Sequence, residues 1–287
     1  MKPSSCLLGI LVFAFAGAAI GQTPYQSSAD FEKYARMLRE KALLKLEPNV
    51  VIPTANRPLN RPRYPWKNNI VTTTFWIGES ASANNPVSNY ASCWDLNWSA
   101  SFGGFDNPNP AARRGFVPAN FIPRQNPFYC ALPYNDVTRG ATKLEAKTAI
   151  PWYNETYEKE GQSICRDRWI RIRSRGGKDC YAQWSDCGPF RTDHWQYVFG
   201  DERPKPNLNQ GAGLDVSPAV RDYLALSSTD VTDWQFVDFH DVPRGPWSMY
   251  GDNNNFVQLA RRNPDRTVKL DPPPVKVPEP SVILHVR

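Results

Sequence analysis

Histidine is scarce in this chain: 3 of the 287 residues, namely His194, His240 and His285. None of them stands at the spacing from a cysteine that zinc ligands normally have. No Gly-x-x-x-x-Gly-Lys-Ser/Thr segment is present to hold a nucleotide phosphate, and no Gly-x-Ser-x-Gly segment to hold a serine nucleophile. The sequence therefore predicts no metal and no cofactor, and it argues against nucleotide-binding and serine-hydrolase functions.

Long apolar runs are also lacking after the first residues. Residues 6–20 form one apolar run, Lys2 precedes it, and Ala19-Ile20-Gly21 offers the small residues at which a signal peptidase cleaves. The run is too short for a membrane helix. The sequence thus predicts a signal peptide over residues 1–21, no stable membrane span, and a protein that is secreted or periplasmic, in the cell envelope.

Basic residues outnumber acidic residues only slightly. The formal net charge is +6, or +5 after loss of Lys2 (+6 − 1). This excess fits an anionic wall polymer or an ordinary solvated surface, and it is too small to indicate a nucleic acid partner. The sequence leaves the oligomeric state open.

Five cysteines follow the predicted signal peptide, so at least one of them has no partner within the chain. Cys165 and Cys180 flank a segment that predicts a hairpin with a turn at Gly176-Gly177. A hairpin can bring its two ends together, and export permits disulfides. We therefore predict a disulfide between these two residues, while the pairing of Cys93, Cys130 and Cys187 stays open.

The composition divides the chain into four parts. Residues 22–69 begin with an apolar stripe over 28–46 that predicts an amphipathic helix, followed by a Pro-rich linker. Residues 70–247 carry alternating, aromatic-rich segments that predict one mainly β domain. Residues 248–287, which include PPPVKVPEP, are expected to form an extended tail.

Within the β domain, one segment is unusually long and lacks a clear pattern. It runs from Gly78 to Arg124 and contains the aromatic residues Tyr90, Trp94, Trp98 and Phe102. A loop of this length in a compact domain is usually functional or locally folded. Its rings either line a sugar-binding groove or anchor the loop to the barrel. For Trp94 and Trp98 we favour the anchor.

Two motifs each end a predicted strand with an aspartate beside a turn. The first is Asp186-Cys187-Gly188-Pro189-Phe190, where Gly-Pro breaks the strand. The second is Leu214-Asp215-Val216-Ser217, where Ser217-Pro218 is a helix N-cap followed by proline at the first helical position. We expect a helix over 219–226 after it.

Both motifs, in this order, resemble the signatures of rare lipoprotein A-like proteins, whose fold is shared by lytic transglycosylases, expansins and one group of endoglucanases. The resemblance covers residues 70–239. It implies a six-stranded double-psi β-barrel, here with long loop insertions. The strands are expected at 70–77, 128–133, 164–172, 178–185, 214–216 and 234–239.

The same resemblance implies a function at Asp186 and Asp215. In lytic transglycosylases of this kind one essential carboxylate serves first as acid and then as base toward the sugar's own hydroxyl, with peptidoglycan as substrate. Asp186 matches that residue, and Asp215 matches the second aspartate, which orients or polarises. Tyr129 stands where the family has a histidine that supports activity, in alignment on Leu132-Pro133. This departure favours the alternatives: a non-catalytic, expansin-like wall polysaccharide binder, or a β-glucan endoglucanase.

The residues themselves support a similar interpretation. A carboxyl group can protonate a glycosidic oxygen near neutral pH when burial or a neighbouring charge raises its pKa. Aspartates at strand ends also often accept backbone N–H groups in turns, which is the structural alternative. Candidate substrate-binding residues are Tyr129, Trp184, Trp94 and Asp136. Trp184 has the same strand parity as Asp186, so it lines the site or, as we favour, fills the barrel interior.

Overall fold

A computed structural model describes residues 63–83 and 85–262. The predicted signal peptide, the helix at 28–46, most of the linker and the tail beyond 262 lie outside the described residues. The strands are β1 (Lys67–Thr74), β2 (Arg113–Arg114), β3 (Val117–Pro118), β4 (Tyr129–Leu132), β5 (Val137–Thr138), β6 (Ala141–Thr142), β7 (Trp169–Ser174), β8 (Asp179–Cys187), β9 (Leu214–Val216) and β10 (Thr229–Val237). The α-helices are α2 (Trp98–Phe102), α3 (Ala146–Ala149), α4 (Tyr153–Thr156), α5 (Trp195–Val198), α6 (Pro218–Leu224) and α7 (Asn255–Arg262).

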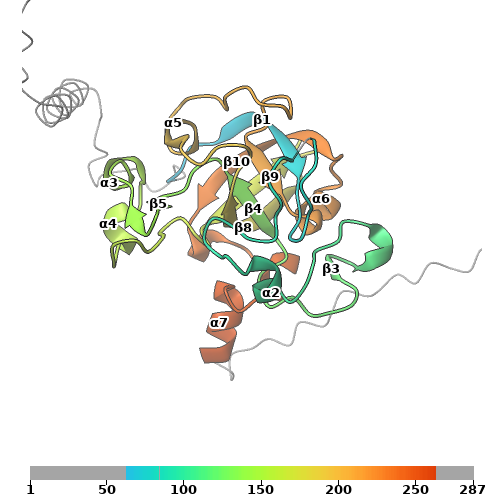
Figure 1. The fold of residues 1–287 in the computed structure, drawn as a ribbon. Helices are drawn as coiled ribbons and strands as arrows, with labels where there is room; N and C mark the ends of the chain where they lie inside the picture. Colours follow the sequence, from blue (N-terminus) through green and yellow to red (C-terminus); the bar gives the residue numbers. More distant parts are fainter. Residues whose placement is uncertain (1–62, 84, 263–287) are drawn as a thin grey trace, which may run out of the picture. The chain divides into compact units, whose positions relative to one another are not determined.

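Six strands close into a barrel in the order β1-β10-β7-β8-β4-β9, which confirms the predicted six-stranded barrel (Figure 1). The sheet is mixed. The pairs β1–β9 and β4–β8 are parallel, whereas the other four neighbouring pairs are antiparallel. Full closure leaves no unpaired sheet edge within the barrel.

Alternating residues of the strands fill the barrel interior. Ile170 and Ile172 of β7 and Ala182 and Trp184 of β8 are fully buried in one apolar cluster. Trp234 of β10 joins them and is also fully buried. The interior position that we favoured for Trp184 is thus confirmed, and large rings rather than a cavity occupy the centre of the barrel.

The segment after β9 folds as its local sequence predicts. The Ser217 hydroxyl accepts a hydrogen bond from the Val220 N–H at 3.3 Å, and Pro218 begins α6. The helix ends at Leu224, two residues earlier than expected, because Ala225 takes a left-handed conformation with φ 56°. This short helix follows the second aspartate directly, so it fixes the direction in which the chain leaves the site.

The long loop forms a second apolar cluster on the outer face of β4. Tyr129 and Ala131, which alternate with the inward Cys130 and Leu132, pack there with Trp98 of α2. Phe75, Ile77 and Phe102 complete the cluster. Trp98 is 1% exposed, which confirms its role as an anchor. The loop is therefore held against the barrel by buried area.

The part of the chain after residue 247 differs from the expected extended tail. Residues 255–262 form α7, and its Phe256 is buried against Trp169 at 5.9 Å and Phe239 at 4.8 Å between ring centroids. Phe256, Leu259 and Ala260 have the i, i+3, i+4 spacing of one helical face, so the local sequence does indicate this helix. Across the described ranges, no helix has the length and apolar character needed to cross a bilayer.

Candidate carboxylate site

A β-bulge in β8 turns Asp186 away from the barrel interior. Cys130 pairs with Trp184, but the next residue of β4, Ala131, pairs with Asp186, so Ser185 is an extra residue. An inserted residue reverses the alternation of side chains beyond it. Trp184 therefore faces the interior while Asp186 faces the outer side with Ala131. Simple strand parity, which puts Trp184 and Asp186 on one face, is wrong here for this reason.

The two aspartates lie on either side of Ala131. In the parallel pairing of β4 with β8, Ala131 is opposite Asp186, and in the antiparallel pairing with β9 it is opposite Asp215. Residues opposite one another in register share a face of the sheet, and neighbouring strands are about 4.8 Å apart. The Cα atoms of the two aspartates are therefore about 10 Å apart across β4. Both carboxylates belong to the same end of the barrel.

The two motifs also meet directly. A Cβ atom added to Gly188 would lie 3.7 Å from the Asp215 Oδ2. The turn that ends β8 thus passes over the second aspartate, with Gly188 itself 2 residues beyond Asp186 in the chain. Phe190, the last residue of the first motif, is 40% exposed. Sequence elements separated by a long segment are thereby brought into a single site.

Burial raises the pKa of both carboxyl groups. Loss of hydration raises the pKa of Asp186 to about 7, against the opposing effect of hydrogen bonds from the Cys93 and Cys187 backbone N–H groups. Burial likewise raises the pKa of Asp215 to about 7, and the hydrogen bond from the Thr73 hydroxyl opposes this. The negative charge of Asp186 raises the pKa of Asp215 further. Near neutral pH each group can thus exchange a proton, as general acid–base chemistry requires.

Sequence reasoning missed a third carboxylate, Glu79. It lies just after β1, and its Oε2 accepts a hydrogen bond from the Asn89 Nδ2 at 2.9 Å. Its charge also raises the pKa of Asp215, and burial raises its own pKa. Gly78, with φ +87°, makes the turn that carries the chain to Glu79. The sequence signals for this position are the glycine and its place at the start of the long loop.

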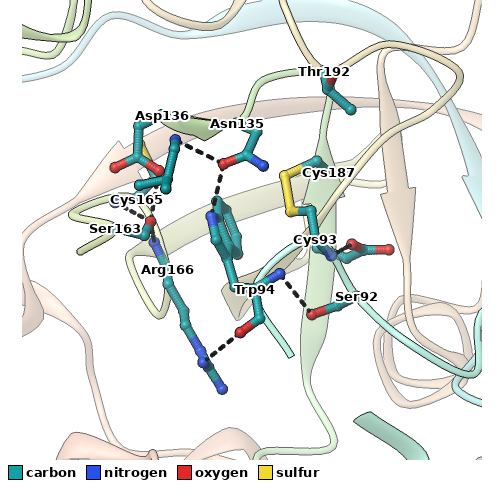
Figure 2. Close-up of a disulfide and its surroundings, with 12 residues drawn as sticks. Ser92, Cys93, Trp94, Asn135, Asp136, Ser163, Cys165, Arg166, Cys187 and Thr192 are labelled. Carbon is teal, nitrogen blue, oxygen red and sulfur yellow. Dashed lines mark hydrogen bonds between the residues drawn. A yellow bond between two sulfur atoms is a disulfide. The ribbon is translucent and has the colours of Figure 1, made fainter. Parts of the chain in front are cut away.

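A disulfide fastens the long loop over the site. Cys93 is bonded to Cys187, 94 residues apart in sequence (Figure 2). The Cys93 N–H donates to the Asp186 Oδ1 at 2.8 Å. The disulfide therefore joins the loop to the residue that follows Asp186. Asp186 is only 9% exposed under this cover. The sulfur atoms and the Asp186 carboxylate lie within 4.8 Å of one another, but the disulfide leaves no thiolate there to bind a metal.

The predicted disulfide between Cys165 and Cys180 is wrong. Both are free and buried, as is Cys130. The hairpin register places Ile172 opposite Cys180, which is the second residue of the returning strand and lies next to the turn. Cys165 precedes Ile172 by seven residues and lies at the opposite end of the hairpin. Figure 2 shows it beside Asp136 and Ser163, apart from the Cys93–Cys187 bond.

Tyr129, which aligns with a histidine of the proteins that the sequence resembles, is held by hydrogen bonds within the protein. Its hydroxyl donates to the Asp106 Oδ2 at 2.9 Å and accepts from the Ile77 N–H at 3.1 Å. Asp106 is fully buried and also paired with Arg113. These hydrogen bonds direct the hydroxyl toward the loop rather than toward Asp186 or Asp215. Sequence reasoning missed this buried Tyr–Asp–Arg group, because its members come from separate elements.

Two other candidates, Trp94 and Asp136, also make internal contacts. The Trp94 Nε1 donates to the Asn135 Oδ1 at 2.9 Å (Figure 2). The Trp94 ring lies edge-on to Trp184 at 5.5 Å between centroids. Trp94 therefore covers the end of the barrel interior, as an anchor would. Asp136 accepts from the Ser163 hydroxyl at 2.6 Å and from the Ile164 N–H at 2.7 Å. A substrate contact by Tyr129, Trp94, Asp136 or Trp184 stays a prediction.

No protein-family model matches the chain, and no curated protein matches it. The site is thus defined by its own geometry: one buried and one partly exposed carboxylate beside one strand, at one end of a closed mixed barrel, under a disulfide-fastened loop.

Proposed function

We propose that this protein is an exported, cell-wall glycan-active enzyme that cleaves peptidoglycan strands by lytic transglycosylation, with Asp186 as general acid and base. The supporting observation is the placement of Asp186 and Asp215 on either side of Ala131, with the pKa of each raised to about 7. A group with that pKa is present in both protonation states near neutral pH, so it can give a proton and take one back.

We further propose that the barrel is of the double-psi type. Its six strands fall into two sets of three in chain order: β1, β4 and β7, then β8, β9 and β10. We exchange β1 with β8, β4 with β9, and β7 with β10. The strands then follow one another around the barrel in the same order, read in the opposite direction. This exchange also replaces the parallel pair β1–β9 with the parallel pair β4–β8, and the reverse. This internal two-fold relation of the connections supports the resemblance carried by the two aspartate motifs.

The proposed reaction uses one carboxyl group twice. Because the Asp186 Oδ1 accepts the Cys93 N–H, the proton of the neutral acid resides on Oδ2. This proton passes to the glycosidic oxygen as the bond to the anomeric carbon breaks. The resulting carboxylate then takes the proton from a hydroxyl group of the sugar that holds the anomeric carbon. At the same time, the oxygen of this hydroxyl group bonds to the anomeric carbon. The reaction consumes no water, and one product carries an anhydro-sugar end.

Asp215 supports this sequence through its charge. In its ionised form it stabilises positive charge that develops at the anomeric centre, as carboxylates of glycosidases do. The Thr73 hydroxyl holds one of its oxygens, and Gly188 leaves space beside the other. The side chain is partly exposed, unlike that of Asp186. We therefore place the sugar on the Asp215 side of the pair.

A second candidate is a non-catalytic wall polysaccharide-binding module. The environment of Tyr129 favours it, since no histidine stands at this position and the Tyr129 hydroxyl is committed to Asp106. Under this proposal the polymer is peptidoglycan or another wall polysaccharide, and the carboxylates only position it.

Incubation of the purified protein with peptidoglycan, followed by mass analysis of the soluble fragments, distinguishes the two. Fragments with anhydro-sugar ends support the transglycosylase, and reducing ends indicate a hydrolase instead. Intact glycan with protein retained on it supports the binding module and contradicts the enzyme.

A further inference from the structure

A surface hollow of about 370 Å³ lies in the long loop region, beside the outer cluster on β4. The rings of Phe105, Phe121 and Pro118 and the amide-bearing residues Asn107 and Asn120 line it. Within the part of the chain that the structure describes, no charged residue lines this hollow. It therefore offers apolar faces and amide hydrogen-bonding groups without a fixed charge.

The Phe105 ring is exposed yet firmly held. It is 53% exposed, although a Cβ atom on Gly78 would come within 2.3 Å of its Cδ1, so the ring packs directly on the Gly78 backbone. The next residue, Asp106, is fully buried, paired with Arg113, and donates its N–H to the Ile77 carbonyl at 2.9 Å. An exposed aromatic ring that is already ordered binds a ligand with little further loss of conformational entropy.

Tyr90 and Phe105 contact the segment that carries Glu79. The Tyr90 ring, 42% exposed, meets Phe105 edge-on at 5.3 Å between centroids, and its hydroxyl is hydrogen-bonded to the Ser80 hydroxyl at 3.1 Å. Gly78, beneath Phe105, precedes Glu79, whose charge acts on Asp215. Phe105 thus lies between the hollow and the segment that carries Glu79.

We propose that the hollow and the Tyr90–Phe105 pair form a sugar subsite, which holds an uncharged ring of a polysaccharide whose neighbouring part extends to Asp186 and Asp215. The C–H face of a sugar packs on exposed aromatic rings, and its hydroxyl and amide substituents match the side chains of Asn107 and Asn120. The lack of fixed charge disfavours an anionic group or a charged peptide at this position. This inference rests on the proposed function for the identity of the polymer.

Titration calorimetry of the purified protein tests the subsite with three probes: peptide-free peptidoglycan glycan strands, cellotetraose, and free stem peptides from peptidoglycan. Phe105→Ala is expected to weaken saccharide binding about fivefold to tenfold. Asn120→Ala is expected to weaken it about threefold. Leu144→Ala, at a side chain 92% exposed and outside the hollow, is the matched control and leaves binding unchanged. Thermal unfolding of each variant verifies that it folds.

Saccharide affinity unchanged in both folded hollow variants overturns the subsite, as does binding of stem peptides alone or of no probe. If Phe105→Ala does not fold, Asn120→Ala decides. Loss of affinity in Phe105→Ala and Asn120→Ala supports the subsite even where no fragments are released and the proposed enzyme fails.

Discussion

Asp186 and Asp215 both face Ala131, one from the parallel neighbour β8 and the other from the antiparallel neighbour β9. Strands from distant parts of the sequence thus deliver two carboxylates to one outer face of the barrel. The bulge at Ser185 is essential to this arrangement, because without it Asp186 would face the apolar interior. The long loop, which the Cys93–Cys187 disulfide holds over the site, then limits the exposure of Asp186 to 9%.

The raised pKa of Asp186 makes stability depend on pH. Its pKa rises from 3.8 unfolded to about 7 folded, so the folded state binds the proton more tightly. The associated stability is fully present below pH 3.8 and is lost as pH rises through about 7. The loss has an upper limit of about 4 kcal/mol. Relative to wild type, Asp186→Asn is therefore expected to gain stability between pH 4 and pH 8.

Urea unfolding of wild type and Asp186→Asn across this pH range measures the effect. Asp241→Asn, at an exposed aspartate, serves as the control and should track wild type. A stability difference between Asp186→Asn and wild type that is flat from pH 4 to pH 8 would contradict the raised pKa.

The Cys93–Cys187 bond should stabilise the loop that covers the site. It closes a loop of 94 residues, so its loss is expected to lower the free energy of unfolding by roughly 2–4 kcal/mol. Cys187→Ser should show this loss and no further effect of reductant, while Cys165→Ser should keep the sensitivity to reductant. Peptide mapping under non-reducing conditions tests the pairing of Cys93 with Cys187. A cross-linked peptide that joins Cys165 to Cys180 would contradict this pairing.

The Tyr129 hydroxyl should matter for stability rather than for chemistry. Tyr129→Phe leaves the buried Asp106 carboxylate without one of its donors, at an expected cost of about 1–3 kcal/mol. Glycan release by the folded variant should stay within about twofold, since the hydroxyl contacts neither aspartate.

Tyr134→Phe is the matched control for this prediction. Tyr134 is fully buried, and its hydroxyl has no hydrogen-bond partner among the described residues. Its loss is therefore expected to be neutral or stabilising. Equal destabilisation by the two substitutions, in denaturant unfolding, would argue against a specific Tyr129–Asp106 bond.

Local patterns predicted the elements that depend on neighbouring residues. Ser217-Pro218 located the start of α6, and the alternation around Leu214-Asp215-Val216 located β9 with its correct ends. The features that define the site depend on residues far apart in sequence. The bulge arises from how β8 pairs with β4, and the disulfide joins positions 94 residues apart. Neither leaves a periodic trace, so strand parity and hairpin proximity led to the wrong face for Asp186 and the wrong cysteine pair.

The central claim is that Asp186 transfers the proton, and Asp186→Asn tests it most directly. Asparagine keeps the size of the side chain and can still accept the Cys93 N–H, but it cannot donate an acidic proton. Release of anhydro-sugar fragments from peptidoglycan, followed by mass spectrometry, should fall about 10²–10⁴-fold while retention on the wall is unchanged. Asp241→Asn should release fragments as wild type does. Undiminished release by folded Asp186→Asn would contradict the account.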